Sequence, residues 1–168
     1  HRMGNFAKAQ AYHLEAKEIR SKVLGKEDPY YAASLYNLGM LCNEMGTYDE
    51  AEQYFLEAKE IQAKALGREN SEYVATLGRL ATLYFNQGKY EQSERLNLDV
   101  KDIREKMTGK ESPQYAQSLN NLASLYMATG QFDLAEQYYL EARAIREKTV
   151  GKEDKDYAAS LGNLGILY

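Results

Sequence analysis

The sequence predicts an all-α solenoid, in which antiparallel pairs of helices are stacked one after another. Its most regular feature is a glycine that returns with a spacing of 42 residues, at Gly4, Gly46, Gly88 and Gly130. Leucines keep the same spacing, at Leu35, Leu77, Leu119 and Leu161. A fixed period of this length is typical of an array of one supersecondary unit, and no stretch shows the apolar–polar alternation of a β-strand.

The first helix of each unit is predicted from its capping residue. Side chains able to accept a hydrogen bond from free backbone N–H groups recur at Asp28, Asn70, Ser112 and Asp154. A proline follows two of these caps, as at Pro29, and takes the first helical position. Leu35 and Cys42 then share one helical face. We expect Gly46 to end this helix in a left-handed conformation.

A second helix is predicted from Tyr48 to Leu66, where Gly67 stops it. Its buried stripe consists of Tyr48, Ala51, Phe55, Ala58 and Ile61. Gly39 on the first helix is expected to face Ala51 on the second, and two small residues let helix backbones approach closely. Each unit should therefore be an antiparallel helical hairpin.

The 168 residues form one predicted array, with repeat units at 4–45, 46–87, 88–129 and 130–168. The helices at 5–24 and 157–168 lack a partner within the sequence, so we expect a fragment of a longer protein. Their uncovered faces carry Leu14, Ile19, Leu161, Leu164 and Leu167. Complementary apolar ends make head-to-tail self-association a candidate property.

Composition argues against nucleic acid and membranes as partners. The net charge of -4 and the single cysteine, Cys42, are the informative numbers. An acidic chain lacks the concentrated Lys and Arg that phosphate contacts need, so nucleic acid is not an expected partner. The lone cysteine excludes an internal disulfide, and neither a signal peptide nor a membrane-spanning segment is present. These features predict a cytoplasmic location and no membrane partner.

At this point the residues resemble a known family. The run Leu35–Gly39 (LYNLG), followed by Gly46–Ala51 (GTYDEA), resembles the tetratricopeptide repeat, although the usual period is about 34 residues. Leu119–Tyr126 (LNNLASLY) and Ala144–Lys148 (AIREK) resemble the long repeats of kinesin light chains and of bacterial tetratricopeptide proteins. The resemblance implies a right-handed superhelix whose concave groove is lined by the first helix of each pair.

The residues of the first helices that do not serve internal packing form the predicted groove stripe. The stripe consists of Tyr36, Asn37, Met40, Asn43, Arg79, Thr82, Phe85, Asn86, Asn120, Asn121, Ser124, Met127 and Asn163. Tyr36, Met40, Phe85 and Met127 would give it an apolar side. The alternative for these four residues is ordinary core packing.

Asn37, Asn121 and Asn163 occupy one equivalent position, at which Arg79 stands in the remaining unit. Asn within a helix costs roughly half a kcal/mol relative to Ala, so helix propensity does not explain its recurrence. A carboxamide donates and accepts, so a row of them could grip the backbone of an extended peptide. Arg79 could bind an acidic side chain, a phosphate or a terminal carboxylate. The alternatives are that the amides bond to a neighbouring helix and that Arg79 is solvated or paired within the chain.

No residue pattern predicts catalysis or a cofactor. His13 stands where Phe55 and Tyr139 are its equivalents, which favours a packed or partly exposed structural role. Cys42 corresponds to Tyr84, and no His–Asp pair accompanies it. The spacing of acidic and histidine residues does not suit a metal ion. The sequence therefore predicts neither an enzyme nor a metal or cofactor site.

The sequence favours a protein-interaction module that holds an extended peptide or flexible segment in its concave groove. The expected partner is a protein or a peptide. The alternative is a structural spacer or an intramolecular regulatory arm of a larger multidomain protein.

Overall fold

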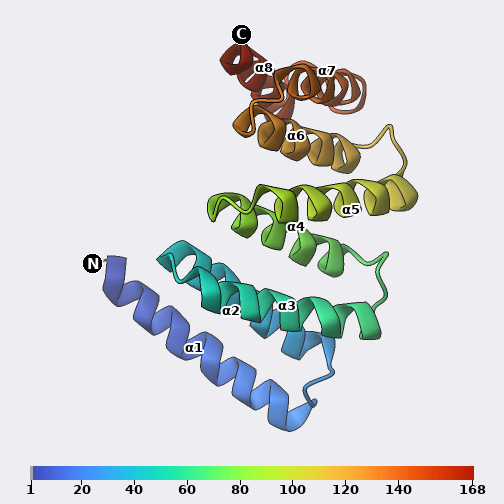
Figure 1. The fold of residues 1–168 in the computed structure, drawn as a ribbon. Helices are drawn as coiled ribbons and strands as arrows, with labels where there is room; N and C mark the ends of the chain where they lie inside the picture. The colour runs from blue at the N-terminus through green and yellow to red at the C-terminus, as the bar shows by residue number, and fades with distance from the viewer. Residues whose placement is uncertain (1) are drawn as a thin grey trace. The chain divides into compact units, whose positions relative to one another are not determined.

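The structure is a computed structural model that describes residues 2–168, and all regular secondary structure in that range is helical. Figure 1 shows the helices in chain order. They are α1 (Arg2–Val23), α2 (Pro29–Met45), α3 (Tyr48–Ala65), α4 (Ser71–Asn86), α5 (Tyr90–Thr108), α6 (Pro113–Ala128), α7 (Phe132–Thr149) and α8 (Lys155–Leu167).

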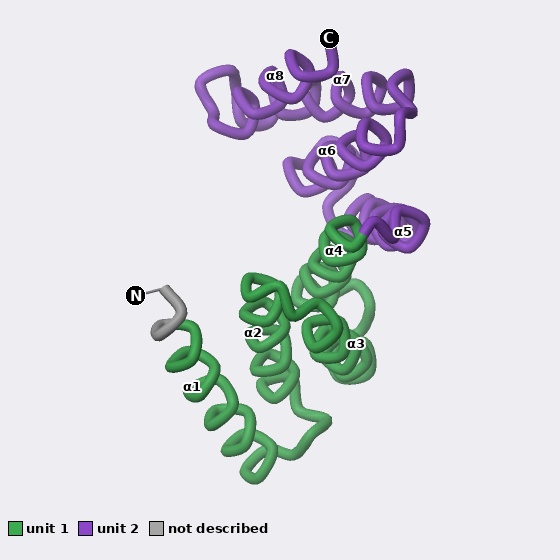
Figure 2. The backbone as a smooth tube through the Cα atoms, turned by 60° about the vertical axis from the view of Figure 1, so that its left-hand side comes forward, with its two compact units in different colours: residues 1–87 green, residues 88–168 purple. Residues whose placement is uncertain are grey.

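The chain divides into two compact units, which are coloured separately in Figure 2. Unit 1 extends to Gln87 and contains α1–α4, and unit 2 begins at Gly88 and contains α5–α8. Within unit 1, α2 packs against α1, α3 and α4, and its most extensive contact is with α3. Within unit 2, α6 packs against α5 and α7, and α7 packs against α8.

The predicted caps mark the starts of the even-numbered helices. Asp28 Oδ1 accepts a hydrogen bond from the Tyr30 N–H at 2.8 Å, and Asn70 Oδ1 accepts from Glu72 at 2.8 Å. Ser112 and Asp154 accept from backbone N–H groups at the starts of α6 and α8 in the same way. These side chains satisfy free N–H groups of the first turn, so local sequence decides where the even-numbered helices α2, α4, α6 and α8 begin.

A turn of two residues joins α2 to α3 and makes the two helices an antiparallel hairpin. Gly46 is left-handed there, with φ of 79°. The N–H of Thr47 donates to the Cys42 carbonyl at 2.9 Å, which satisfies the end of α2. Gly130 plays the same role between α6 and α7, with φ of 77°. The predicted hairpins are confirmed in both of these pairs.

Each hairpin encloses an apolar cluster. In unit 1, Tyr31 and Leu35 of α2 pack on Ala58 of α3. The space beside Gly39 is filled by the ring of Phe55, since a Cβ atom on Gly39 would lie 2.8 Å from that ring. Gly39 thus leaves room for a large side chain of α3, and a direct contact between Gly39 and Ala51 stays a prediction.

The two end helices each leave an apolar face uncovered. On α8, Leu161 is 46% exposed, whereas its equivalent Leu119 on α6 is fully buried. On α1, Ile19 is 53% exposed. The prediction that Leu164 is also uncovered was wrong, because Leu164 packs into the cluster that α6 and α7 form around Tyr139.

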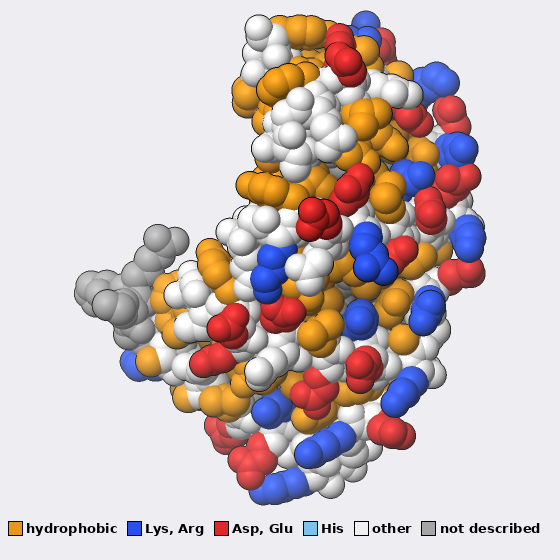
Figure 3. Space-filling view, viewed as in Figure 1, with side chains coloured by type: hydrophobic (Ala, Val, Ile, Leu, Met, Phe, Trp, Pro, Cys, Tyr) orange, Lys and Arg blue, Asp and Glu red, His pale blue; other side chains and the backbone are white. Residues whose placement is uncertain are grey.

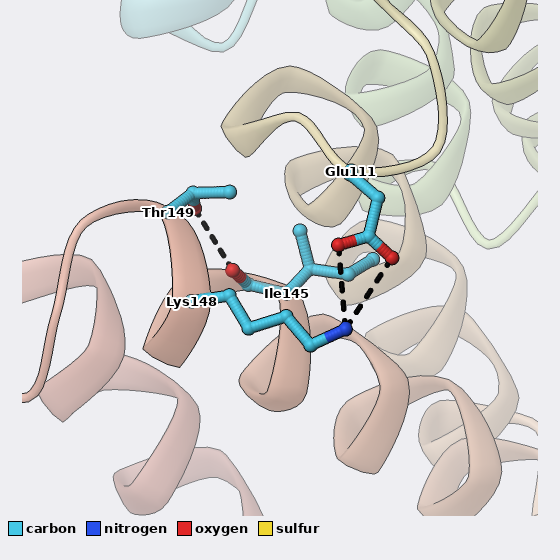
Figure 4. Close-up of polar contacts among 4 residues, drawn as sticks. All are labelled: Glu111, Ile145, Lys148 and Thr149. Atoms are coloured by element: carbon cyan, nitrogen blue, oxygen red, sulfur yellow. Dashed lines mark hydrogen bonds and ion pairs between the residues drawn. The ribbon is translucent and has the colours of Figure 1, made fainter.

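Charged side chains of both signs are interleaved on the face of the molecule that Figure 3 shows. In unit 2 the Lys148 ammonium lies 3.4 Å from the Glu111 carboxylate, and Thr149 donates to the Ile145 carbonyl beside it (Figure 4). Lys148 and Glu111 are both largely exposed, so this pair contributes little to stability. No helix among residues 2–168 is both long and apolar enough to cross a membrane.

Candidate peptide-binding site

The predicted stripe residues lie on the even-numbered helices, and none of them is fully buried. In unit 1 the exposed members are Asn37, Arg79, Thr82 and Asn86. The half-buried members of unit 1 are Tyr36, Met40, Asn43 and Phe85. In unit 2 all members are half-buried, namely Asn120, Asn121, Ser124, Met127 and Asn163. Leu35, Leu77 and Leu119, on the opposite face of these helices, are almost completely buried.

In unit 1 an aromatic hydroxyl anchors the arginine of the stripe. Arg79 Nε on α4 donates to the Tyr36 hydroxyl on α2 at 3.2 Å. The Tyr36 ring in turn lies against Phe55, with 5.8 Å between ring centroids. Arg79 has no carboxylate partner in the described part of the chain, so its charge is not neutralised internally. The arrangement holds a cation at an exposed position beside an aromatic ring.

In unit 2 the same two positions carry amides. Asn163 Nδ2 on α8 donates to Asn120 Oδ1 on α6 at 2.7 Å. Asn121 Oδ1 accepts from Gln117 Nε2, one turn earlier on α6, at 2.8 Å. Asn37 in unit 1 makes no side-chain hydrogen bond to any residue the structure describes. Of the three asparagines at this repeat position, Asn121 and Asn163 are thus hydrogen-bonded within unit 2. Asn37 is the one whose amide has no side-chain hydrogen bond to a described residue.

Other stripe residues serve the scaffold. The Ser124 hydroxyl bonds to the Asn120 carbonyl at 3.0 Å and to the Tyr139 hydroxyl at 2.9 Å. Thr82 donates to the Gly78 carbonyl of its own helix at 3.0 Å. Met127 packs against the cluster that contains Tyr139. Of these three residues, only Met127 shows the core packing that was the alternative to its groove role, and a ligand contact of Ser124 or Thr82 stays a prediction.

Sequence reasoning missed a polar clamp that joins an odd-numbered helix to the next even-numbered one. In unit 2, Arg146 on α7 is 3% exposed and donates to the Asp156 carbonyl at 3.1 Å and to Ser160 Oγ at 2.7 Å. Arg20 makes the same pair of bonds in unit 1, and Arg104 does so in unit 2. The signal was present in the sequence, because arginine recurs at 20, 104 and 146 with the repeat period.

Between α3 and α4 the clamp has different residues, because the repeating arginine is absent there. Gln62 stands at the arginine position of α3, and Thr76 on α4 donates to its Oε1 at 2.7 Å. Gln62 is 2% exposed. Beside it lies a hollow of about 160 Å³, lined by Ala33, Tyr36, Gln62, Glu72 and Ala75. Tyr36 belongs both to the stripe and to the lining of the hollow, so the hollow lies directly beside the stripe.

A second clamp, also missed, pairs a tyrosine with a glutamate. The Tyr84 hydroxyl donates to Glu52 Oε1 at 2.8 Å in unit 1, and Tyr126 donates to Glu94 Oε1 at 2.8 Å in unit 2. Burial, together with the adjacent carboxylate, raises the pKa of Tyr84 to about 12. The pKa of Tyr126 is raised for the same reasons. Both hydroxyls are therefore protonated donors at neutral pH.

The remaining candidate reactive groups are structural. Cys42 is buried, and burial raises the pKa of its thiol above the ordinary value, which disfavours the nucleophilic thiolate. His13 is half-buried on α1. No group of His, Cys, Asp and Glu among the described residues could hold a metal ion.

Comparison with known proteins places the chain in a class. The family model described as tetratricopeptide repeat matches residues 1–64, 33–106, 72–148 and 114–168. The chain therefore belongs to the tetratricopeptide repeat family. Repeats of this family mediate protein–protein interactions, so the protein is an interaction module in this general sense. No curated protein matches the chain at a significant level.

Solved structures similar to this chain include BtubC and kinesin light chain-like repeat proteins. BtubC (BKLC) from P. vanneervenii is 27% identical with a TM-score of 0.87, and the match covers 99% of this chain and 66% of that chain. A putative kinesin light chain from Podosopora anserina with nearly identical TPR-like repeats is 28% identical with a TM-score of 0.83, and a single-residue variant of it is 29% identical with a TM-score of 0.84. Those two matches cover 99% of this chain and 79% of theirs. These similarities confirm the predicted fold class, an all-α solenoid of antiparallel helix pairs.

Proposed function

We propose that the protein binds an extended peptide or a flexible protein segment along the stripe of its even-numbered helices. The observation that carries this proposal is in unit 1. Asn37 is exposed without a side-chain hydrogen-bond partner among the described residues, and Arg79 is held at an exposed position by Tyr36. Asparagine is a poor helix former, so helix stability alone does not account for Asn37 at this exposed position.

The chemistry of the stripe suits backbone recognition. An amide such as Asn37 can accept from a peptide N–H and donate to a peptide carbonyl, whatever side chains the peptide carries. Each such bond nets on the order of 1 kcal/mol, so several are needed for useful affinity. Arg79 adds a charged donor that favours an acidic or anionic group of the ligand. The family's general role in protein interactions supports the same conclusion.

The proposal is tested by selecting peptides from a random display library on the immobilised chain and measuring their affinity by calorimetry. The double variant Asn37→Ala/Asn121→Ala should weaken binding severalfold while the melting temperature changes little. The matched control is Gln53→Ala/Gln137→Ala, which removes two amides at equivalent positions of α3 and α7. Selected peptides that bind both double variants as tightly as the parent protein would contradict the proposal.

A second proposed interaction uses the ends of the array, and it is carried by the exposure of Leu161. Its equivalent Leu119 is buried against α7, so an odd-numbered helix covers this face within unit 2. The odd-numbered helix α1 exposes the apolar residues Leu14 and Ile19. We infer that α8 of one copy receives α1 of another, in a head-to-tail contact that need not close.

The spacer or regulatory-arm function remains the alternative to peptide capture. Under it the stripe would be occupied by another part of the same protein. The chain spans 66% of the length of BtubC, so the activity of a whole protein of that kind is not assigned to it. The buried free thiol of Cys42 suits a reducing compartment, and on that basis we propose a cytoplasmic location.

A further inference from the structure

The hollow in unit 1 has a counterpart in unit 2 that shows what fills it. The five lining residues Ala33, Tyr36, Gln62, Glu72 and Ala75 correspond, 84 positions later, to Gln117, Asn120, Arg146, Asp156 and Ala159. The two sites are thus equivalent places in the repeat. Unit 1 has the smaller residue at two of these positions, Ala33 for Gln117 and Gln62 for Arg146, and the larger one at Tyr36, where unit 2 has Asn120.

In unit 2 this place is occupied by the guanidinium of Arg146. Its NH1 group donates to the Asp156 carbonyl and to Ser160 Oγ, and its NH2 group donates to Gln117 Oε1 at 2.8 Å. Arg146 is 3% exposed, so the guanidinium closes the space between α6 and α8. Burial lowers the pKa of this guanidinium from its ordinary value, yet arginine stays charged at physiological pH.

In unit 1 two substitutions empty the same place. Gln62 is shorter than Arg146, and its Oε1 turns to the Thr76 hydroxyl at 2.7 Å. Ala33 lacks the side chain with which Gln117 meets the guanidinium. What remains is the hollow of about 160 Å³, with Glu72 on its wall. The Glu72 carboxylate has no ion-pair partner in the described part of the chain.

We propose that the hollow of unit 1 is a subsite for an arginine side chain of the bound peptide, which takes the place that Arg146 fills internally in unit 2. The inference rests on the proposed function, because the hollow adjoins the stripe at Tyr36. The inference goes beyond that function because it specifies one residue of the peptide, an arginine, which the stripe alone does not.

The lining suits a guanidinium better than an ammonium or an alkyl group. The methyl groups of Ala33 and Ala75 and the ring of Tyr36 offer apolar surfaces to the flat faces of a guanidinium, which is weakly hydrated and stacks on aromatic rings. Glu72 offers a carboxylate that can accept two parallel N–H bonds. Gln62 Oε1 accepts one hydrogen bond from Thr76 and retains capacity for a second.

Arg79 does not occupy the subsite. It lies one turn beyond Ala75 on α4, and Glu72 lies one turn before Ala75 on the other side. The Nε of Arg79 is engaged by the Tyr36 hydroxyl. A ligand arginine therefore enters on the side of Glu72, and Arg79 is left to select an acidic group further along the peptide.

The test uses the whole chain and the probe N-acetyl-L-arginine N-methylamide. Alanine methyl groups are labelled for NMR, and the probe is titrated with the neutral citrulline analogue as its matched control. The methyl resonances of Ala33 and Ala75 should shift saturably with the arginine probe, and Ala159 of unit 2 should not shift. The citrulline analogue should bind at least about tenfold more weakly, because it lacks the charge that strengthens hydrogen bonds to Glu72.

A closing variant supplies the decisive comparison. Ala33→Gln/Gln62→Arg rebuilds in unit 1 the pair that Gln117 and Arg146 form in unit 2, so it should fold and fill the hollow with the protein's own guanidinium. The arginine probe should then no longer shift Ala75. Should this variant fold poorly, Glu72→Gln replaces it, and a severalfold loss of probe affinity is expected.

Two results would overturn the inference: equal binding of the arginine and citrulline probes, or an Ala75 shift that survives in the folded closing variant. The proposed function fails separately. Peptides that are sensitive to Asn37→Ala/Asn121→Ala yet indifferent to Ala33→Gln/Gln62→Arg would leave peptide binding in place and remove the arginine subsite.

Discussion

The Nε of Arg79 donates to the hydroxyl of Tyr36 at 3.2 Å, and Asn163 donates to Asn120 at the equivalent positions of unit 2 at 2.7 Å. Both bonds join neighbouring even-numbered helices across the predicted stripe. The same backbone arrangement therefore carries a cation with an aromatic ring in one unit and two amides in the other. The two units can in this way present different chemistry at equivalent positions of the repeat.

The bond between Asn120 and Asn163 should be measurable as a coupling energy. A double-mutant cycle with Asn120→Ala and Asn163→Ala isolates the interaction from the other losses of each substitution. Because both side chains are half-buried and neutral, we expect a coupling of about 0.5–1.5 kcal/mol in the free energy of unfolding of unit 2. A coupling indistinguishable from zero would mean that these amides are not held by each other in solution.

Two glycines at one repeat position should respond oppositely to alanine. A Cβ atom on Gly39 would lie 2.8 Å from the Phe55 ring, so Gly39→Ala should cost about 1–3 kcal/mol through overpacking. Gly165 is the equivalent residue on α8, and a Cβ there meets nothing within 4 Å. Gly165→Ala should be neutral or stabilise by up to about 0.5 kcal/mol, because alanine is the better helix former. Denaturant unfolding of both variants decides this, and equal effects would contradict the prediction.

Helix boundaries could be predicted from the sequence because local residues determine them. Asp28 accepts a hydrogen bond from the first turn of α2, and Gly46 closes the same helix with φ of 79°. These interactions involve residues close together in the chain, so they can be recognised without knowing the packing. The tetratricopeptide fold follows from their regular repetition.

The polar partners between helices could not be predicted in the same way. Tyr84 and Glu52 are 32 residues apart, and the period alone does not say which tyrosine meets which glutamate. The hollow beside Gln62 was harder still to foresee, since it depends on two smaller side chains, Ala33 and Gln62, meeting at one place. A residue that breaks the period is informative only together with its neighbours in space.

Arg146 should be the most sensitive polar residue of unit 2. Arg146→Ala removes three hydrogen bonds and leaves Ser160 and Gln117 without this partner, so we expect a loss of about 2–4 kcal/mol. Arg146→Gln should cost less, because a glutamine in unit 1 already pairs with Thr76 at the equivalent place. Hydrogen exchange of the α8 amides reports the loss locally.

The control for Arg146 is Lys148→Ala, which removes an exposed ion pair two residues away. It should change the stability of unit 2 by less than about 1 kcal/mol. An Arg146→Ala variant whose α8 amides exchange as slowly as those of the control would show that the clamp does not hold α8 in place.

The clamp between Tyr84 and Glu52 should make unit 1 sensitive to alkaline pH. The pKa of Tyr84 is about 12 in the folded protein, whereas an unperturbed tyrosine has a pKa of about 10. A folded pKa above the unfolded one means that this stabilisation is fully present below about pH 10 and is lost as pH rises toward about 12. Tyr84→Phe should flatten the decline of stability over that window.

The matched substitution for Tyr84 is Tyr12→Phe, which removes a hydroxyl that is exposed on α1. It should leave the decline above pH 10 unchanged. The measurement is denaturant unfolding at a series of alkaline pH values for the parent protein and both variants. Parallel curves for the parent protein and Tyr84→Phe would show that the tyrosine–glutamate bond does not shift the titration of Tyr84.

The uncovered ends should make the chain self-associate at high concentration. Leu161 is 46% exposed on α8 and Ile19 is 53% exposed on α1, and both belong to faces that helices cover elsewhere in the array. Sedimentation velocity over a wide concentration range should show a mass that keeps rising, because a head-to-tail contact does not close.

Leu161→Lys should abolish this rise in mass, since it places a charge in the centre of the contact. Leu140→Lys, at a residue of α7 that is 38% exposed, should leave the rise intact. A monomer at every concentration, or equal effects of the two lysines, would count against association through these ends.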